Sequence, residues 1–208
     1  MSDVAREARH AGGRGSVAAV VLAAGRATRM GGAKLLLPVG GRPMVQRVVD
    51  ASLGSKASQT IVVVGNEAEK VSEALAGRPV TVVVNPDYAK GMSTSLRAGL
   101  SAVDPAADGA IILLGDQPFV SAALLDALID RFARCAKRVV RPSVDGRPGN
   151  PVLVSATLFA ELAEARGDLG GRRVIERRSG EVCMVPVDDP HELVDIDSPQ
   201  EYEEEKDA

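Results

Sequence analysis

Aromatic residues are scarce in this 208-residue chain, which has three Phe, two Tyr and no Trp. Proteins that bind single-stranded nucleic acid stack bases on aromatic side chains, so this scarcity argues against that class. Charge of either sign is not in excess, because 25 Lys and Arg face 28 Asp and Glu and leave a net charge of -3. A basic field that would predict a nucleic-acid partner is therefore missing as well.

Cysteine is equally scarce, with Cys135 and Cys183 far apart and no C-x-x-C pair. This usage is typical of a reducing compartment and predicts neither a disulfide framework nor a zinc site. No apolar run approaches the ~20 residues of a membrane span, and the first sixteen residues lack the apolar stretch of a signal peptide. We expect a cytoplasmic protein without a membrane partner, with a disordered leader over residues 1–16 and one domain over 17–208.

The most informative stretch begins with a β-branched, apolar run, Val17–Leu22, which is typical of a strand buried on both faces. The run ends in a small-residue loop that carries Arg26, Arg29 and Lys34. Small residues let backbone N–H groups approach phosphate oxygens, and the cations neutralise the phosphate charge. This stretch predicts a polyanion site, although a glycine-rich turn with solvated charges would have the same composition.

Two common phosphate loops are excluded by spacing. The Walker loop needs Gly-Lys-Ser/Thr, whereas Lys34 lies between Ala33 and Leu35. The dinucleotide fingerprint needs G-x-G-x-x-G directly after the strand, and Gly25 and Gly31 are too far apart for it.

Apolar strands alternate with amphipathic helices along the chain. We expect strands at 17–22, 60–64, 80–84, 110–114, 138–141, 152–154 and 182–187, and helices at 44–53, 67–75, 92–102, 122–132 and 156–165. This alternation predicts an α/β fold with a mostly parallel sheet. Ligands of such sheets bind beyond the carboxyl ends of the strands, so we expect chemistry after Leu22, Val64, Val84 and Leu114.

Polar residues follow two of these strands. Asp116 comes just after the strand 110–114. It can start a turn before Pro118, or hold Mg²⁺ together with substrate phosphates. Asn85 follows the strand 80–84, and Ser93 and Ser95 begin the next helix, where their hydroxyls can cap the helix or contact a ligand.

The C-terminal segment contains two separate signals. Ser198, Pro199 and Glu201 form a capping box that begins a helix. Asp195 and Asp197 alternate along an extended stretch, so their side chains share a face.

Several motifs resemble those of one family. Leu22-Ala23-Ala24-Gly25, Arg29-Met30-Gly31 and Lys34-Leu35-Leu36 resemble the signature L-A-A-G-x-x-x-R-M-G-x-x-K of the MobA-like nucleotidyltransferases. Gly91–Gly99, Gly115–Pro118, Gly146–Val152, Gly167–Arg172 and Asp195–Glu201 match further blocks of that family. The branch that the chain resembles most is that of the molybdenum cofactor cytidylyltransferases.

The resemblance implies a single-domain, Rossmann-like nucleotidyltransferase (GT-A-like) fold and Mg²⁺-dependent transfer of an NMP with release of pyrophosphate. It implies that Arg29, Lys34 and Asp116 are catalytic. It implies nucleotide contacts from Leu22, Ala23, Ala24, Gly25, Arg29, Lys34, Asn85, Ser93, Ser95 and Asp116, and acceptor contacts from Asn150, Asp168 and Arg172. Asp116 and Asp197 would hold the metal, with Asp195 a weaker candidate.

The specific expectation is transfer of CMP from CTP to molybdopterin-bound molybdenum, with a molybdoenzyme receiving the product. CTP is expected because this chain has Ala24, where the guanylyl branch of the family tends to have Gly. Many relatives have His where this chain has Asn150. The Asn side chain does not titrate, so we expect no proton transfer there, and a sugar-1-phosphate acceptor stays open. A nicotinamide- or flavin-dependent oxidoreductase and a non-catalytic carrier of the molybdenum cofactor are the alternatives from other classes.

Overall fold

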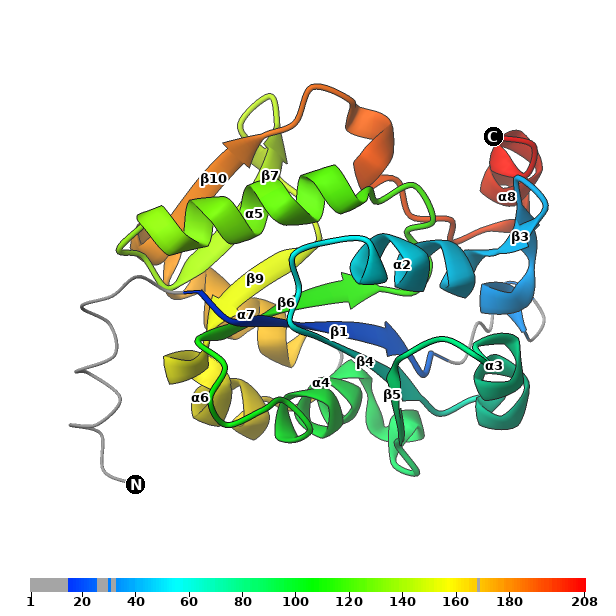
Figure 1. Cartoon of the computed structure of the whole chain (residues 1–208), viewed down its shortest axis with the longest axis horizontal. Coiled ribbons are helices and arrows are strands. Elements are labelled where there is room, and N and C mark those ends of the chain that lie inside the picture. Colours follow the sequence, from blue (N-terminus) through cyan, green and yellow to red (C-terminus); the bar gives the residue numbers. More distant parts are fainter. Residues whose placement is uncertain (1–14, 26–29, 31–32, 168) are drawn as a thin grey trace.

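The computed structural model describes residues 15–25, 30, 33–167 and 169–208, and it places a twisted sheet between two layers of helices (Figure 1). The strand order of the main sheet is β10-β7-β9-β6-β1-β4-β5. Four strands on one side are parallel: β1 (Val17–Ala23), β4 (Gln59–Val64), β5 (Thr81–Val84) and β6 (Gly109–Leu114). This is the mostly parallel α/β fold that the sequence predicts.

The other side of the sheet is mixed. Strand β9 (Val152–Ser155) runs antiparallel between β6 and β7 (Val139–Val144), and β10 (Val182–Pro186) is parallel to β7 at the edge. Strand β8 (Arg147–Pro148) folds back on β7, and β2 (Pro38–Val39) pairs with β3 (Arg42–Pro43) apart from the main sheet.

Helices cover both faces of the sheet. Helices α2 (Met44–Leu53), α3 (Ala68–Ala74) and α5 (Ala122–Arg134) pack on one face, and α4 (Met92–Ser101), α6 (Phe159–Glu164) and α7 (Gly170–Glu176) pack on the other (Figure 1). Helix α8 (Pro199–Glu205) ends the chain. Short 3-10 turns, η2 to η6, span Lys34–Leu36, Tyr88–Lys90, Ala156–Leu158, Ser179–Glu181 and Pro190–Leu193.

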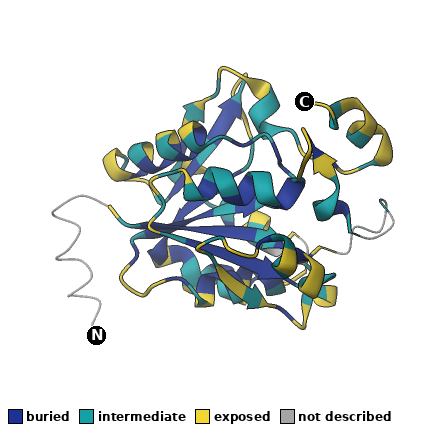
Figure 2. Cartoon of the chain, turned by 45° about the vertical axis from the view of Figure 1, so that its right-hand side comes forward, coloured by how far each residue is buried: buried dark blue, intermediate teal, exposed yellow. Residues whose placement is uncertain are grey.

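Strand β1 is the centre of the core. Val17, Ala19 and Val21 point into the layer of α2 and α5, whereas Ala18 and Val20 point into the layer of α4 and α6. All five are 0% exposed, and Figure 2 shows the buried strands between helices whose outer faces are exposed. The two-sided burial explains why the sequence of β1 is apolar at every position instead of alternating.

Helix α4 lies very close to β1. A Cβ atom at Gly99 would collide with the Cγ1 atom of Val20, and it would lie 3.0 Å from Cγ2 of Val63. The absence of a side chain at Gly99 therefore lets α4 approach the sheet. Gly91 begins the helix with a φ of 109°, a conformation that other residues rarely adopt.

The predicted elements are present, with shifted ends. Helix α2 has the predicted bounds. The predicted strand 138–141 extends to Val144 as β7, and the predicted helix 156–165 is the turn η4 followed by the short α6. The predicted strand 182–187 is present as β10, at the edge of the sheet.

The expectation for the cysteines is wrong. Cys135, just after α5, and Cys183, in β10, form a disulfide with an S–S distance of 1.93 Å. The sequence separation of 48 residues hides a contact that exists because α5 packs against the edge of the sheet where β10 lies.

The N-terminal end of the described chain is attached to the domain. The backbone N–H groups of Gly15 and Ser16 donate to Oδ2 of Asp108 at 2.9 and 3.1 Å. The rest of the predicted leader, residues 1–14, lies outside the described part of the chain. No helix within the described residues has the length and apolar character needed to cross a membrane.

Candidate functional site

The end of β1 lies beside the turns that follow β4 and β6. The N–H of Gly115 donates to the carbonyl of Leu22 at 3.0 Å, and the N–H of Asn66 donates to the carbonyl of Ala24 at 3.4 Å. Ala23 and Ala24 are buried and Gly25 is exposed. Arg26 and Arg29, the predicted phosphate ligands of this loop, lie outside the described residues.

Three of the predicted site residues meet at this edge of the sheet. The ammonium nitrogen of Lys34 lies 2.8 Å from Oδ2 of Asp116 and 2.7 Å from Oδ1 of Asp197. The Lys34 side chain is 7% exposed, whereas those of Asp116 and Asp197 are 25% and 50% exposed. The ammonium is thus enclosed, and the two carboxylates remain accessible from the solvent side.

Long-range contacts bring Asp197 to this position. The N–H of Ile196 donates to the carbonyl of Asp116 at 3.0 Å, and the Ile196 side chain is fully buried against Val39 and Met44. On its other side, the carboxylate of Glu201 accepts from the N–H of Asp197 at 2.8 Å as part of the capping box of α8. The predicted capping box therefore also orients the carboxylate that precedes it.

Electrostatics favour the charged form of Lys34. Burial lowers the pKa of Lys34, but the charges of Asp116 and Asp197 and the hydrogen bonds to them outweigh this effect, so that the pKa lies above its ordinary value. The pKa of Asp195 is raised, first by loss of hydration and then by the negative charges of Asp197 and Asp116. Asp195 is therefore near the cluster without bonding to Lys34.

The cluster offers oxygen ligands to a divalent cation. Asp116 and Asp197 already converge on one positive charge, and carboxylate oxygens are the ligands that Mg²⁺ prefers. Among the described residues, no three His, Cys, Asp or Glu side chains are grouped so as to hold a metal ion by themselves. The donor set fits an ion whose remaining ligands come from water and phosphate, as is usual for Mg²⁺.

Asn85 and Ser95 form a buried network next to the site. The Nδ2 atom of Asn85 bonds to the hydroxyls of Thr94 and Ser95, at 2.9 Å each, and its Oδ1 accepts from the N–H of Asp87 at 3.0 Å. These side chains join the segment after β5 to the first turn of α4. Ser93, 3% exposed, lines a separate pocket.

That pocket has a volume of about 480 Å³ and lies between the sheet and α4, α6 and α7. Two predicted acceptor residues, Asn150 and Arg172, line it, and Arg172 bonds to Glu176 at 2.7 Å. The third, Asp168, lies outside the described residues. Leu22 and Leu114 belong to its wall, so the pocket reaches the ends of β1 and β6.

Arg141 is a charged lining residue that was not predicted from the sequence. Arg141, in the middle of β7, donates from Nε to the carbonyl of Gly149 at 3.0 Å. The sequence signal that could have identified it is an Arg at the third position of a mostly buried strand, because arginine is seldom placed on a core face without a partner.

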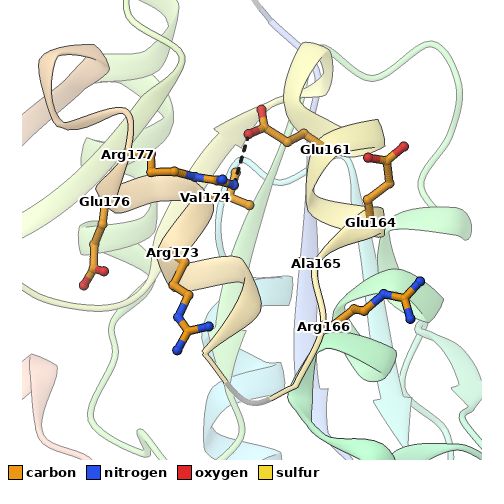
Figure 3. A pocket seen from close by; sticks show the side chains of 8 residues that line it. All are labelled: Glu161, Glu164, Ala165, Arg166, Arg173, Val174, Glu176 and Arg177. Atoms are coloured by element: carbon orange, nitrogen blue, oxygen red, sulfur yellow. Dashed lines mark ion pairs between the residues drawn. The ribbon is translucent and has the colours of Figure 1, made fainter.

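A second hollow of about 750 Å³ lies between α6 and α7 (Figure 3). Its walls carry both signs of charge, and Arg177 pairs with Glu161 at 3.7 Å. None of the predicted site residues lines it.

Comparison with known proteins identifies the family. A sequence profile of the MobA-like NTP transferase domain matches residues 19–182. The chain is 32% identical to the purine catabolism protein PucB of Bacillus subtilis, over 88% of this chain and 93% of PucB. It is 29% identical to the nicotine blue oxidoreductase of Paenarthrobacter nicotinovorans, over 88% and 92% of the two chains.

Solved structures agree in fold and sequence. The crystal structure of Rv0371c from Mycobacterium tuberculosis superimposes with a TM-score of 0.84 at 32% identity, covering 93% of this chain and 98% of that one. A complex of Rv0371c with manganese gives a TM-score of 0.80 at 31% identity, with 93% and 99% covered.

Proposed function

Because the chain belongs to the MobA-like NTP transferase family, we propose that it transfers CMP from CTP to a phosphate of the molybdenum cofactor and releases pyrophosphate. The observation that carries this proposal is the meeting of Lys34, Asp116 and Asp197 at the carboxyl end of the sheet. An ammonium and two accessible carboxylates, beside a loop of small residues, are the groups that a metal-bound triphosphate requires.

Asp116 and Asp197 are the residues that would hold the divalent ion, which we take to be Mg²⁺. Their convergence on the Lys34 ammonium supports this assignment, since one positive charge already occupies the position between them. The related protein Rv0371c forms a complex with manganese. When bound, such an ion neutralises phosphate charge and orients the transferring group.

Lys34 would exchange its hydrogen-bond partners when the metal and the nucleotide bind. With a divalent ion on the two carboxylates, its ammonium would donate to phosphate oxygens of the triphosphate instead. There it would stabilise the charge that develops on the departing pyrophosphate. Arg29 is proposed to assist on the strength of the motif.

The reaction needs no general base on the protein. An acceptor phosphate oxygen forms a bond to the α-phosphorus of the nucleotide, the bond from that phosphorus to the bridging oxygen breaks, and pyrophosphate leaves. A phosphate monoester is already ionised near neutral pH, so the contribution of the chain is positioning and electrostatic stabilisation. The pocket beside Leu22 and Leu114 is the proposed acceptor site, with Asn150 and Arg172 at its wall.

The choice of CTP rests on Ala24, and Asn85 and Ser95 are the proposed contacts to the base and ribose. Ser93, which the family motif also assigns to the nucleotide, lines the proposed acceptor pocket instead. We further propose a cytoplasmic location and a molybdoenzyme as the recipient of the product.

The test is pyrophosphate release from each of CTP, GTP, ATP and UTP with Mg²⁺ and molybdenum cofactor. The proposal expects release with CTP, and a loss of about 100-fold or more in Asp116→Asn. Asp188→Asn, which changes an exposed carboxylate of the C-terminal region, is the matched control and should keep full activity. Release with GTP alone would support the nucleotidyl-transfer reaction but contradict CTP as the nucleotide.

A second candidate is a reductase activity, which one observation favours: a relative covering most of both chains is a nicotine blue oxidoreductase. The lack of a dinucleotide fingerprint after β1 argues against nicotinamide binding. Oxidation of NADH by the purified protein in the presence of a dye, without any nucleotide triphosphate, would favour this alternative.

A further inference from the structure

Arg141 brings a positive charge to the wall of a largely apolar pocket. It lies on β7 between Val140 and Pro142, and its neighbours in the lining include Ile112, Val152 and Leu162. Arginine in such surroundings is costly unless its hydrogen bonds are satisfied. The partners of its guanidinium are therefore informative.

Only part of that guanidinium is satisfied within the described chain. Its Nε donates to the carbonyl of Gly149, and no ion pair joins it to a carboxylate among the described residues. The described residues also contain no buried polar side-chain atom without a hydrogen-bond partner. The two terminal nitrogens of Arg141 form no hydrogen bond within that part of the chain, and its side chain is only partly buried and lines the pocket.

The surrounding charges leave this position positive. Burial lowers the pKa of Arg141, and the charge of Arg172 lowers it further, against an opposing effect of Glu176. Glu176 is itself bonded to Arg172 at 2.7 Å. A bound anion would relieve the repulsion between the two guanidinium groups and satisfy the donors of Arg141.

We propose that Arg141 binds the phosphate group of the acceptor and is the residue that selects for a phosphate monoester. This inference rests on the proposed function and deepens it. Two parallel N–H donors of a guanidinium match two phosphate oxygens, and Nε remains on the Gly149 carbonyl. The apolar wall would contact the rest of the acceptor.

The position of the pocket suits this role. Leu114, at the end of β6, lines the pocket and lies two residues before Asp116. The pocket that Arg141 lines therefore reaches the edge of the sheet where the groups proposed to hold the triphosphate lie. A structural role alone, as a brace for the segment at Gly149, would not require accessible donors.

The test is a calorimetric titration of the full chain with phenyl phosphate, a simple phosphate monoester with an apolar ring. Wild type should bind it, Arg141→Gln should bind it at least 10-fold more weakly, and Arg141→Lys should lie between them because a point charge cannot form the two-pronged contact. The matched control is Arg173→Gln on α7, which removes an arginine that lines the other hollow (Figure 3) and should leave binding unchanged. Benzoate should bind more weakly than phenyl phosphate in wild type.

Any of three results with phenyl phosphate would overturn the inference. These are no binding to wild type, equal binding by wild type and Arg141→Gln, and displacement of phenyl phosphate by CTP with Mg²⁺, which would place it at the triphosphate site. If benzoate bound to wild type as tightly as phenyl phosphate or more tightly, the recognised group would be a carboxylate and not a phosphate, and the inference would also be overturned. The melting temperature of Arg141→Gln should still rise with CTP and Mg²⁺. This rise shows that the variant is folded and binds the nucleotide, so a failure of the acceptor proposal can be distinguished from a failure of the proposed function.

Discussion

The ammonium of Lys34 lies 2.8 Å from the carboxylate of Asp116, although 82 residues separate them in the sequence. Lys34 comes directly after the loop that follows β1, and Asp116 comes directly after the neighbouring strand β6. Parallel pairing of these strands brings both segments to one edge of the sheet. With Asp197 bound to the same ammonium, the site contains a cation between two carboxylates.

Lys34→Gln should weaken folding and strengthen metal binding. Removal of the buried ammonium leaves Asp116 and Asp197 facing each other without a counter-charge, and we expect a loss of about 1–3 kcal/mol in the free energy of unfolding, measured in urea. Millimolar Mg²⁺ without nucleotide should raise the melting temperature of the variant more than that of wild type, because the competing cation is gone.

Lys56→Gln is the matched control for this experiment. It removes a lysine that pairs with Asp130 on the exposed surface, and it should change stability by less than about 1 kcal/mol without any new response to Mg²⁺. An identical response of Lys34→Gln and wild type to Mg²⁺ would contradict the overlap of the ammonium with the metal position.

Glu181 should make stability depend on pH in the acid range. The hydrogen bonds of Arg138 lower the pKa of Glu181 to about 2 against the opposing effect of desolvation, and Arg178 adds to the lowering. Because the folded pKa lies below that of the unfolded chain, the stabilisation is complete above the ordinary pKa of 4.5 and is lost as the pH falls towards 2. Urea unfolding between pH 5 and pH 2.5 should therefore show a smaller decrease in Glu181→Gln than in wild type. Parallel decreases would be inconsistent with this effect.

Gly99→Ala should destabilise the protein by about 1–3 kcal/mol, because the added methyl group collides with Val20 on β1 and helix α4 must shift. Gly180→Ala is the control, since a Cβ atom there meets nothing within 4 Å. Chemical denaturation of both variants measures the difference. Equal stability of Gly99→Ala and wild type would mean that α4 does not pack on β1 as closely as described.

The Cys135–Cys183 bond should be detectable by thiol titration of the denatured, unreduced protein. We expect no reactive thiol before reduction and two after it. Cys183→Ser should lower stability by roughly 2–4 kcal/mol under oxidising conditions, because the bond restricts the unfolded chain. Two free thiols in the unreduced protein would contradict the bond.

Local signals in the sequence predicted most of the fold. The apolar run of β1 and the capping box at Ser198 each depend on residues close in sequence, and each is confirmed. The antiparallel insertion of β9 between β6 and β7 was not predicted, because a four-residue buried strand contains no information on its direction.

The candidate site was predictable to a smaller extent. Strand ends indicated Lys34 and Asp116, but the placement of Asp197 beside them depends on the long-range bond from Ile196 to the Asp116 carbonyl. The contact of Arg141 with the pocket and the pairing of Cys135 with Cys183 likewise depend on the packing of distant elements. Neither follows from spacing along the chain.

The most direct test of the central claim is the melting temperature with CTP, in the presence and absence of Mg²⁺, for wild type and Asp116→Asn. A ligand at a hundred times its dissociation constant contributes roughly 2.7 kcal/mol, which for a domain of this size raises the midpoint by about 5–10 °C. We expect a rise of this size in wild type that requires Mg²⁺ and is lost in Asp116→Asn. A rise with NADH and none with any nucleotide triphosphate would contradict it.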